Sequence, residues 1–285
     1  MRTPISYYGG KQKMLPHILP LIPVHEVYSE VFFGGGSVFF EKTPAKNETI
    51  NDKSDIVINF YTTLKSNYKL LKKRIDETLV SKTQFDQALS IIRLHKLIKR
   101  NHESYIANTV EYRVELAWAF WVATNLAFAN KIGGGLKFSN DMGTNVCKTL
   151  KLKKSEFTDM LVNRIEGATI ENRDALIILK SRNVPKAFHY IDSPYPNTDQ
   201  GHYKGYTWED YENLLKSCET ITGKFLISGY NSEMLDAYVT KNNWIKKEID
   251  LPLTANNRGD KKNNKRKIEV LVRNYDNTHG TMKMF

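Results

Sequence analysis

The chain of 285 residues contains only two cysteines, Cys147 and Cys218, which lie far apart in the sequence. Neither belongs to a CxxC pair or to a cysteine–histidine spacing, so the sequence predicts no zinc site and no other metal site. So few cysteines also argue against a disulfide-built secreted fold and fit a reducing cytoplasm. No stretch approaches the roughly 18 consecutive apolar residues that a membrane span needs, and no apolar segment follows a basic start. We therefore expect a soluble protein of the cytoplasm.

Two glycine motifs that commonly hold phosphates are also missing. The pattern GxxxxGK[ST] does not occur, which argues against a P-loop kinase or ATPase. The segment FFGGGSVFF at 32–40 has glycines after an apolar run, but it lacks the GxGxxG spacing of a dinucleotide site. A glycine-rich turn between a strand and a helix still lets a ligand approach the backbone closely.

Acidic residues are the minority among the charged residues. The chain has 42 Lys and Arg against 31 Asp and Glu, which gives a formal net charge of +11. Basic proteins often bind polyanions, because Lys and Arg displace the counterions condensed on phosphates. The alternative is that the excess lysine only aids solubility. Composition does not decide between these two readings, and it does not distinguish DNA from RNA.

The first zone, to about residue 65, predicts the start of an α/β sheet. An apolar strand at 27–33 runs into three glycines, and a helix begins at 37–42. A short second strand at 48–51 is followed by a helix at 55–64 with apolar residues on one face. The order strand, glycine turn, helix, strand is typical of this fold class.

The middle zone, about 66–165, breaks this alternation and predicts an inserted, mostly helical domain. Its apolar segment VELAWAFWVATNLAFA indicates a buried helix, and NKIGGGLKFSNDMG indicates a glycine-tipped hairpin or an ordered loop. The expected helices are 67–78, 83–100, 111–129 and 155–165.

The last zone, 166–285, returns to alternating strands and helices. The expected strands are 169–172, 187–191, 224–228 and 267–273, and the expected helix is 207–221. Acidic residues in the first turns of that helix suit the helix dipole. The segment 256–267 (NNRGDKKNNKRK) is predicted to be a basic loop.

The segment YIDSPY at 190–195 carries the strongest chemical signal. An apolar strand runs directly into an acid, a proline and an aromatic residue. At the carboxyl edge of a parallel sheet, this turn projects its side chains into the ligand crevice. Asp192 can accept a hydrogen bond from an amine, Pro194 stiffens the turn, and Tyr195 can stack on a planar base. The alternative is a structural turn with a packed tyrosine.

Five segments, in this order, resemble motifs of Dam-type DNA adenine-N6 methyltransferases. ISYYGGKQKMLPHILPLIP (5–23) resembles their N-terminal motif, in which an aromatic residue precedes GGK. SEVFFGGGSVFFEK (29–42) resembles their cofactor motif EPFxGxG, and INDKSDIVINFYTTLK (50–65) resembles the acidic segment that follows it. IENRDALIIL (170–179) resembles the stretch before their catalytic motif, and DSPY (192–195) resembles the catalytic motif DPPY.

The resemblance covers nearly the whole chain outside the middle zone. It implies a catalytic domain at 1–65 and 166–285 that binds S-adenosylmethionine, with a Rossmann-like methyltransferase sheet covered by helices on both faces. It implies that 66–165 is an inserted helical target-recognition domain that binds double-stranded DNA. The recognition sequence, a cognate endonuclease and a bacterial or viral source stay open, and we expect a monomer.

The same resemblance assigns roles to individual residues. The residues implied to bind the cofactor are Tyr8, Lys11, Phe33, Gly34, Gly36, Asp52, Asp174 and Asp192. Among them, Asp52 is expected at the ribose hydroxyls and Asp174 near the adenine of the cofactor. The residues implied for catalysis are Asp192, Ser193, Pro194 and Tyr195. The alternative for Asp52 is an N-cap, for Lys11 a surface charge, and for Asp174 a helix cap.

These residue types suit methyl transfer to an amine. The lone pair of an adenine amine is delocalised into the ring, so acceptors on its hydrogens help it to become nucleophilic. Asp192 and the carbonyl of Ser193 are the implied acceptors, and Asp192 also stabilises the positive charge that develops on nitrogen. The base must leave the duplex stack to reach them, and Tyr195 then stacks on it. Ser193 departs from the proline that is usual at its position, and serine is less rigid.

The DNA-binding residues are expected in the middle zone. The candidates for phosphate contacts are Lys69, Lys72, Lys73, Arg74, Arg93, Lys96, Lys99 and Arg100. The candidates for base contacts are Asn125, Asn130 and Lys131, next to three glycines. Arg258 in the basic loop is a further candidate. The alternative for each lysine or arginine is an ordinary solvated helix face.

Two other functions stay open at this point. The first keeps the chemistry and changes the substrate to an RNA adenine or to the N4 amine of a DNA cytosine. Cytosine-N4 enzymes usually begin the catalytic motif with serine, whereas Asp192 stands here, which favours adenine. The second is an inactive scaffold that still binds DNA, supported only by Ser193.

Overall fold

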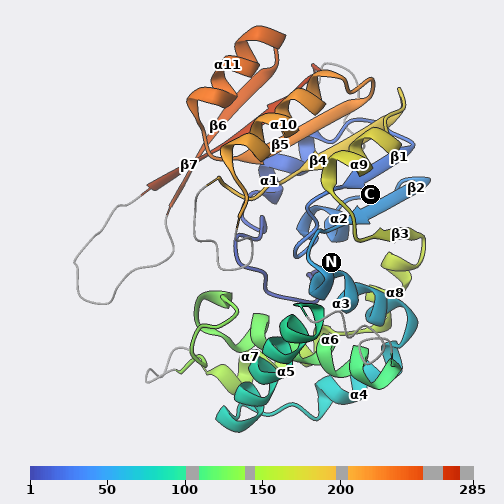
Figure 1. Ribbon diagram of the computed structural model, residues 1–285, viewed down its shortest axis with the longest axis vertical. Coiled ribbons are helices and arrows are strands. Elements are labelled where there is room, and N and C mark those ends of the chain that lie inside the picture. The colour runs from blue at the N-terminus through green and yellow to red at the C-terminus, as the bar shows by residue number, and fades with distance from the viewer. Residues whose placement is uncertain (101–108, 139–144, 197–204, 253–265, 277–285) are drawn as a thin grey trace.

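The structure is a computed structural model that describes residues 1–100, 109–138, 145–196, 205–252 and 266–276. Within these residues, the chain forms a seven-stranded sheet with the order β3-β2-β1-β4-β5-β7-β6 (Figure 1). The strands are β1 Val27–Glu30, β2 Asn47–Asn51, β3 Ala168–Glu171, β4 Ala187–Ile191, β5 Lys224–Gly229, β6 Ile245–Pro252 and β7 Arg266–Arg273. Strand β7 is antiparallel to β5 and β6, and the other pairs are parallel. The predicted α/β class is confirmed.

Helices cover both faces of the sheet, because consecutive residues of a buried strand point to opposite sides. In β5, Phe225 and Ile227 pack in one hydrophobic cluster, and Leu226 between them packs in the other. The helices of the first cluster are α9 Ala175–Ser181, α10 Trp208–Glu219 and α11 Glu233–Asn242. The helices on the opposite face are α1 Leu15–Ile18, continued by the 3-10 helix Leu19–Leu21, α2 Ser37–Glu41 and α3 Asp55–Ser66.

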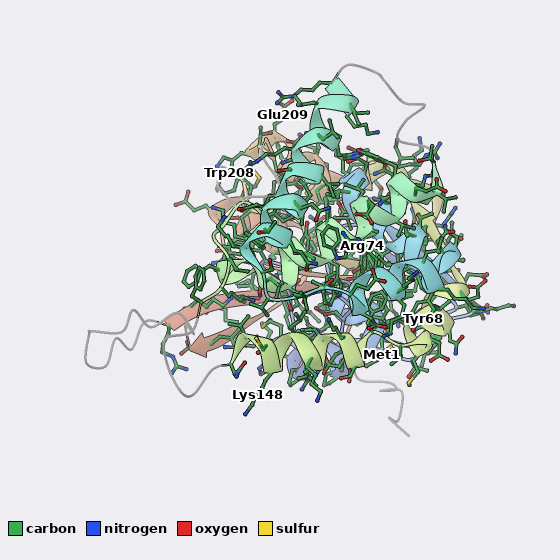
Figure 2. All side chains as sticks on the ribbon, turned by 90° about the horizontal axis from the view of Figure 1, so that it is seen from below. Met1, Tyr68, Arg74, Lys148, Trp208 and Glu209 are labelled. Atoms are coloured by element: carbon green, nitrogen blue, oxygen red, sulfur yellow. The ribbon has the colours of Figure 1, made fainter. Side chains whose placement is uncertain are left out.

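A separate layer of helices follows α3 in the chain and lies below the sheet in Figure 1. These helices are α4 Tyr68–Asp76, α5 Lys82–Arg100, α6 Val110–Leu126, α7 Val146–Glu156 and α8 Asp159–Glu166, with a 3-10 helix at Phe128–Asn130. We call them the helical layer. Figure 2 shows it from below, with Lys148 projecting outward from α7 and Arg74 lying among the helices.

Helix α6 joins the helical layer to the rest of the protein. From Leu116 to Leu126 every residue of α6 is buried, and Trp118, Phe120 and Trp121 are fully buried. The ring of Phe120 lies 5.9 Å from that of Phe60 on α3 and 6.3 Å from that of Tyr7 in the N-terminal segment. One hydrophobic cluster therefore contains side chains from the helical layer and from the sheet with its covering helices. The division at residues 65/66 and 165/166 into two domains stays a prediction.

Several element boundaries differ from those expected. The helix predicted at 155–165 is two helices, α7 and α8, which are separated at Phe157 and Thr158. The helix predicted at 111–129 ends at Leu126. The described part of the expected glycine hairpin contains one antiparallel bridge, between Ala127 and Leu136. Strand β6, helices α1, α9 and α11, and the part of α7 before residue 155 were not predicted.

A buried polar network holds β1 against α2. Oε2 of Glu30 accepts hydrogen bonds from the Tyr28 hydroxyl at 2.8 Å and from the Phe39 backbone N–H at 3.1 Å. Glu30 is only 3% exposed. Burial raises the pKa of Glu30 from 4.5 to about 8, although the hydrogen bond from Tyr28 opposes the rise.

The same region is tied to the helical layer. Arg164 on α8 pairs with Glu48 on β2, and its Nε donates to the carbonyl of Phe39 on α2 at 3.0 Å. The guanidinium also lies 3.5 Å from the centre of the Phe39 ring. Lys42 pairs with the same Glu48. Helix α2, which follows the glycine turn, is therefore held by Glu30 on β1, by Arg164 on α8 and, through Lys42 at its end, by Glu48 on β2.

Glu30→Gln is expected to change how stability depends on pH. The pKa of Glu30 is 4.5 in an unfolded chain and about 8 in the fold. Its contribution to folding is therefore complete below pH 4.5 and is lost as the pH rises to about 8. Glutamine keeps an acceptor for both hydrogen bonds and has no charge to ionise. From pH 5 to pH 8 the unfolding midpoint of the variant, relative to the unmodified protein, should rise by at least about 3 °C.

Thermal unfolding at a series of pH values measures this difference. Glu77→Gln, at an exposed acid beyond the end of α4, serves as the control and should show a constant difference. A midpoint difference for Glu30→Gln that also stays constant with pH would contradict the protonation of Glu30 in the fold.

Candidate active site

The glycine turn after β1 has a conformation that other residues rarely adopt. Gly34 and Gly36 have positive φ angles of 47° and 65°. A Cβ atom on Gly36 would lie 2.4 Å from Cζ of Phe33, so the Phe33 ring occupies the space that a side chain would need. Gly36 is also the N-cap residue of α2. The turn therefore presents bare backbone at the carboxyl end of β1.

Asp52 supports this turn from the end of β2. Its Oδ2 accepts the backbone N–H of Gly34 at 2.9 Å, and its Oδ1 accepts that of Ser54 at 2.8 Å. Asp52 is 1% exposed, and it is not among the residues that line the cavities described below. Its position gives no support to the predicted contact with ribose hydroxyls, because both oxygens face backbone N–H groups. Its neighbours Asn51 and Lys53 line a cavity instead.

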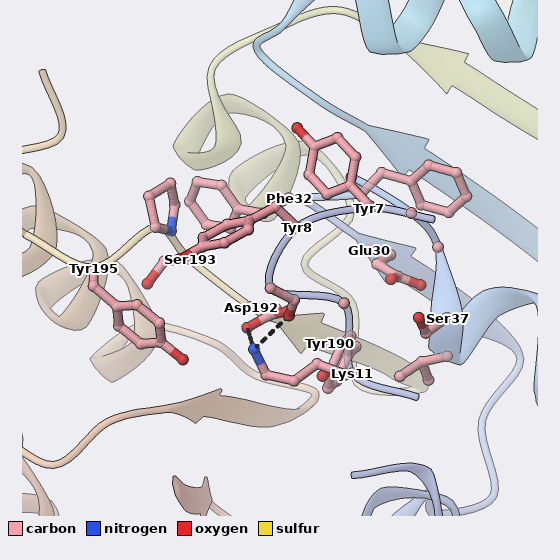
Figure 3. Close-up of a pocket in the computed structure, with 18 residues that line it drawn as sticks. Tyr7, Tyr8, Lys11, Glu30, Phe32, Ser37, Tyr190, Asp192, Ser193 and Tyr195 are labelled. Atoms are coloured by element: carbon pink, nitrogen blue, oxygen red, sulfur yellow. Dashed lines mark hydrogen bonds and ion pairs between the residues drawn. The ribbon is translucent and has the colours of Figure 1, made fainter. Parts of the chain in front are cut away.

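Asp192 follows β4 and forms an ion pair with the N-terminal segment. Nζ of Lys11 lies 2.7 Å from Oδ1 of Asp192 (Figure 3). The hydroxyl of Ser228, on β5, donates to the same oxygen at 3.2 Å. Since Ser228 uses its proton there, the Tyr190 hydroxyl at 2.7 Å donates to Ser228. Burial is the largest single influence on Lys11 and alone would lower its pKa. The charge of Asp192 and its hydrogen bond, together with smaller contributions from Tyr195 and Glu269, outweigh burial and raise that pKa, so Lys11 is an ammonium ion.

Two tyrosine rings stand beside this ion pair. The ring centres of Tyr195 and Tyr230 are 4.2 Å apart, with the planes inclined by 34°. Nζ of Lys11 lies 5.8 Å from the centre of the Tyr195 ring. Burial raises the pKa of Tyr195, so its hydroxyl stays protonated. An aromatic wall, a carboxylate and an ammonium group thus meet at the ends of β4 and β5.

A cavity of about 520 Å³ separates the glycine turn from the DSPY turn. We call it the turn cavity. Its walls are the N-terminal segment 7–11, the glycine turn with Glu30, and residues 190 and 192–195. Strands β1 and β4 are neighbours in the sheet, although the chain leaves β1 in one direction and β4 in the other. Open α/β sheets bind ligands at such a switch point.

A second cavity of about 750 Å³ adjoins the turn cavity, because Phe32 and Pro194 line both. We call it the α9 cavity. It is lined on one side by Asp174 and Leu176 and on the other by Tyr206. Asp174 caps α9 by accepting the backbone N–H of Leu176 at 3.0 Å. The two cavities together form a bent trough along the carboxyl edge of the sheet.

A cleft of about 1480 Å³ opens on the other side of the N-terminal segment. Residues 7–11 line both this cleft and the turn cavity. Basic side chains border the cleft, from the N-terminal segment, α7 and β7: Arg2, Lys11, Lys13, Lys153 and Lys267. Asn130 and Glu269 also line it.

The structure brings together most of the predicted site residues. Those that line the turn cavity are Tyr8, Lys11, Phe33, Gly34, Gly36, Asp192, Ser193, Pro194 and Tyr195. Asp174 lines the α9 cavity, and Asn130 lines the cleft. Sequence analysis missed Glu30, Phe32, Ser228 and Tyr230. A signal existed for Tyr230, because it follows a predicted strand at the same edge of the sheet.

Some predicted DNA-binding residues are engaged within the protein. Arg74 pairs with Glu115 at 2.7 Å, and its guanidinium lies 3.6 Å from the ring centre of Trp118. Lys72 pairs with Asp76 one turn along α4. The Asn125 side chain is buried, accepts from the Ser6 hydroxyl at 2.9 Å and donates to the Trp121 carbonyl at 3.1 Å.

The remaining candidates differ in exposure. Arg93 and Arg100 are exposed on α5, and Lys131 is half-buried. Arg258 lies outside the described residues. The buried or paired states of Arg74 and Asn125 do not favour their predicted roles in DNA binding.

Two features are absent from the described residues. No group of three or more His, Cys, Asp or Glu side chains in this part of the chain is arranged to hold a metal ion. No helix in it is long and apolar enough to cross a membrane.

Residues 7–249 match the family model of the D12 class N6 adenine-specific DNA methyltransferases. The modification methylase StsI of Streptococcus sanguinis is 24% identical over 205 residues, which are 68% of this chain and 29% of that protein. The type II methyltransferase M1.LlaDCHI of Lactococcus lactis subsp. cremoris is 41% identical over 68 residues, which are 24% of this chain and 24% of that protein. The matches span less than a third of the length of either relative.

A solved structure of a precorrin-8w decarboxylase from Methanobacterium thermoautotrophicum shows a weaker likeness. Its TM-score is 0.39 with 11% sequence identity, over 96% of this chain and 95% of that one. A likeness at this level supports no functional conclusion. The family model instead covers the glycine turn, the helical layer and the DSPY turn, and it agrees with the motif order in the sequence. The chain belongs to the D12 class N6 adenine-specific DNA methyltransferase family.

Proposed function

We propose that this chain transfers a methyl group from S-adenosylmethionine to the N6 amine of an adenine in double-stranded DNA. The observation that carries the proposal is one cavity bounded by the glycine turn of β1 and by Asp192–Tyr195 after β4. The first wall suits a cofactor that approaches bare backbone, and the second wall suits a planar base with an amine. The family supports both assignments.

The trough has the walls that such a cofactor needs. The turn cavity offers polar and charged groups to an amino-acid end, from Lys11, Glu30 and the backbone of the glycine turn. The α9 cavity offers Phe32, Leu176 and Tyr206 as apolar or aromatic walls for an adenosine end. Small-molecule sites typically combine such apolar walls with a few polar groups. When bound, this cofactor supplies an electrophilic methyl group on a sulfonium centre.

The protein groups around Asp192 activate the target amine. The carboxylate of Asp192 and the backbone carbonyl of Ser193 accept hydrogen bonds from its two hydrogens, which turns the nitrogen lone pair toward the methyl group. Asp192 also stabilises the positive charge that develops on that nitrogen as the methyl–sulfur bond breaks. After the thioether product leaves, the methylated amine loses one proton. Tyr195 provides a flat surface on which the base stacks after it leaves the duplex.

The basic cleft supports DNA as the substrate. It adjoins the turn cavity along residues 7–11, so a nucleotide flipped from DNA in the cleft has a short path to Asp192. Lys13 and Lys153 line opposite parts of this cleft, on the N-terminal segment and on α7. Such side chains position the phosphate backbone. The names of the relatives, a modification methylase and a type II methyltransferase, support a place beside a cognate endonuclease.

Asp192→Asn is expected to abolish transfer without abolishing cofactor binding. Loss of the carboxylate removes the charge that stabilises the developing cation, and losses of at least about 100-fold in rate are typical for such a group. The measurement is transfer of labelled methyl from S-adenosylmethionine to unmethylated duplex DNA, followed by digestion to nucleosides. The dissociation constant for the cofactor is measured in parallel.

The control is Asp236→Asn, which removes an acid on α11 that pairs with Lys246 on β6. This variant should transfer at the normal rate. Normal turnover in Asp192→Asn would refute the role of this carboxylate, and label in a base other than N6-methyladenine would refute the proposed substrate.

Lys13→Gln is expected to weaken DNA binding about equally for all sequences. If Lys13 contacts a phosphate, its loss should reduce the slope of log affinity against log salt concentration by about 1. Arg93→Gln applies the same test to α5. Lys46→Gln serves as the control, because Lys46 precedes β2 at the opposite edge of the sheet. A larger effect from Arg93→Gln than from Lys13→Gln would place the DNA along α5 and not along the cleft.

A further inference from the structure

Lys11 occupies the position that the target amine requires. Its ammonium group lies 2.7 Å from Oδ1 of Asp192, and the Ser228 hydroxyl already donates to the same oxygen. The amine of a flipped base needs a carboxylate oxygen of Asp192 as its acceptor. A cation beside that oxygen also opposes the positive charge that develops on the nitrogen, since like charges repel strongly in a buried site. Transfer therefore requires Lys11 to move away or to be neutralised.

A second carboxyl group, from β7, lines a cleft that Lys11 also lines. Glu269 is 3% exposed and lines the cleft together with Lys11. Its Oε1 pairs with Lys267 two residues earlier on the same strand. Its Oε2 is buried and has no hydrogen-bond partner among the described residues. A buried carboxylate oxygen without a donor is costly, so a donor that moves toward it is stabilised.

The other acids of the site cannot accept the ammonium group of Lys11. Within the described residues, the acids that line the turn cavity and the cleft are Glu30, Asp192 and Glu269. Oε2 of Glu30 accepts from the Tyr28 hydroxyl and the Phe39 N–H, and the pKa of about 8 keeps this carboxyl group largely neutral at pH 7. Asp192 is the group from which Lys11 must separate. Glu269 remains, and its charge already acts on Lys11 by raising the pKa of the ammonium group.

We propose that Glu269 is a positioning residue for methyl transfer. It binds the ammonium group of Lys11 when the target amine displaces that ammonium group from Asp192. This inference rests on the proposed role of Asp192 as the acceptor of that amine. In the free protein Lys11 neutralises Asp192. With the base in place, Lys11 pairs with Oε2 of Glu269, and the carboxylate of Asp192 is free for the amine. Lys267 stays on Oε1 and anchors Glu269 throughout.

The test is Glu269→Gln, which keeps the size of the side chain and removes its charge. Without the second carboxylate, Lys11 remains on Asp192 and competes with the amine. We expect kcat to fall about tenfold, within the range of couplings between contacting residues. KM for DNA and the dissociation constant for S-adenosylmethionine should change less than about twofold, because neither depends on the exchange of partners. Glu269→Asp, which retains a carboxylate, should recover most of the rate.

A double-mutant cycle tests whether Glu269 acts through Lys11. In a Lys11→Met background no ammonium competes for Asp192, so adding Glu269→Gln should cause no further loss. Glu248→Gln is the matched control, because Glu248 is an exposed acid on the neighbouring strand β6 and should leave kcat unchanged. If Lys11→Met has no measurable transfer, the kcat-against-KM comparison and the recovery in Glu269→Asp decide the question.

Three results would overturn the inference: a normal kcat in Glu269→Gln, an equal loss in the Lys11→Met background, or a loss that Glu269→Asp does not recover at an unchanged unfolding midpoint. Asp192→Asn, measured in the same assay, separates this failure from that of the proposed function. Normal transfer in Asp192→Asn removes the premise. An inactive Asp192→Asn together with a normal Glu269→Gln removes only the role of Glu269.

Discussion

The parallel pairing of β1 with β4 is the constraint on which the active site depends. Ser29 and His189 are 160 residues apart in the sequence, yet they stand opposite each other and share a hydrogen bond of 2.6 Å. In the same register Glu30 faces Tyr190, so both strands end at the same level. The glycine turn and Asp192 meet only because of this register. Everything between the two strands, including the helical layer, must return the chain to that position.

Much of the sheet and of the site was predictable from local sequence. Strand β4 lies at 187–191, as the apolar run AFHYI predicts, and the strands that end in the glycine turn and in DSPY were both expected. The glycines had to be glycines, since positive φ at Gly34 and Gly36 excludes most other residues. Motif order then identified the family, which the family model confirms.

What the sequence could not predict depends on contacts between distant segments. In strand β6, Lys247 interrupts the alternation of Ile245, Ile249 and Leu251, so the pattern of the strand itself is weak. The strand forms by pairing with β7. Arg74 resembles any surface arginine in a lysine-rich helix until α6 brings Glu115 and Trp118 to it. Likewise Glu269 is a plain acid in the sequence. Only the fold brings Glu269 to the cleft that Lys11 also lines, with a buried oxygen that has no hydrogen-bond partner among the described residues.

The contacts of Arg164 have a consequence for how the helical layer can change between relatives. This side chain, on the last helix of the helical layer, holds both β2 and the helix after the glycine turn, while α6 shares its core with α3. The helical layer therefore cannot be exchanged as an independent unit. Grafting it from a relative would replace part of a shared core and one partner of a buried ion pair. Single side chains at the rim of the cleft can change without any rebuilding of this packing.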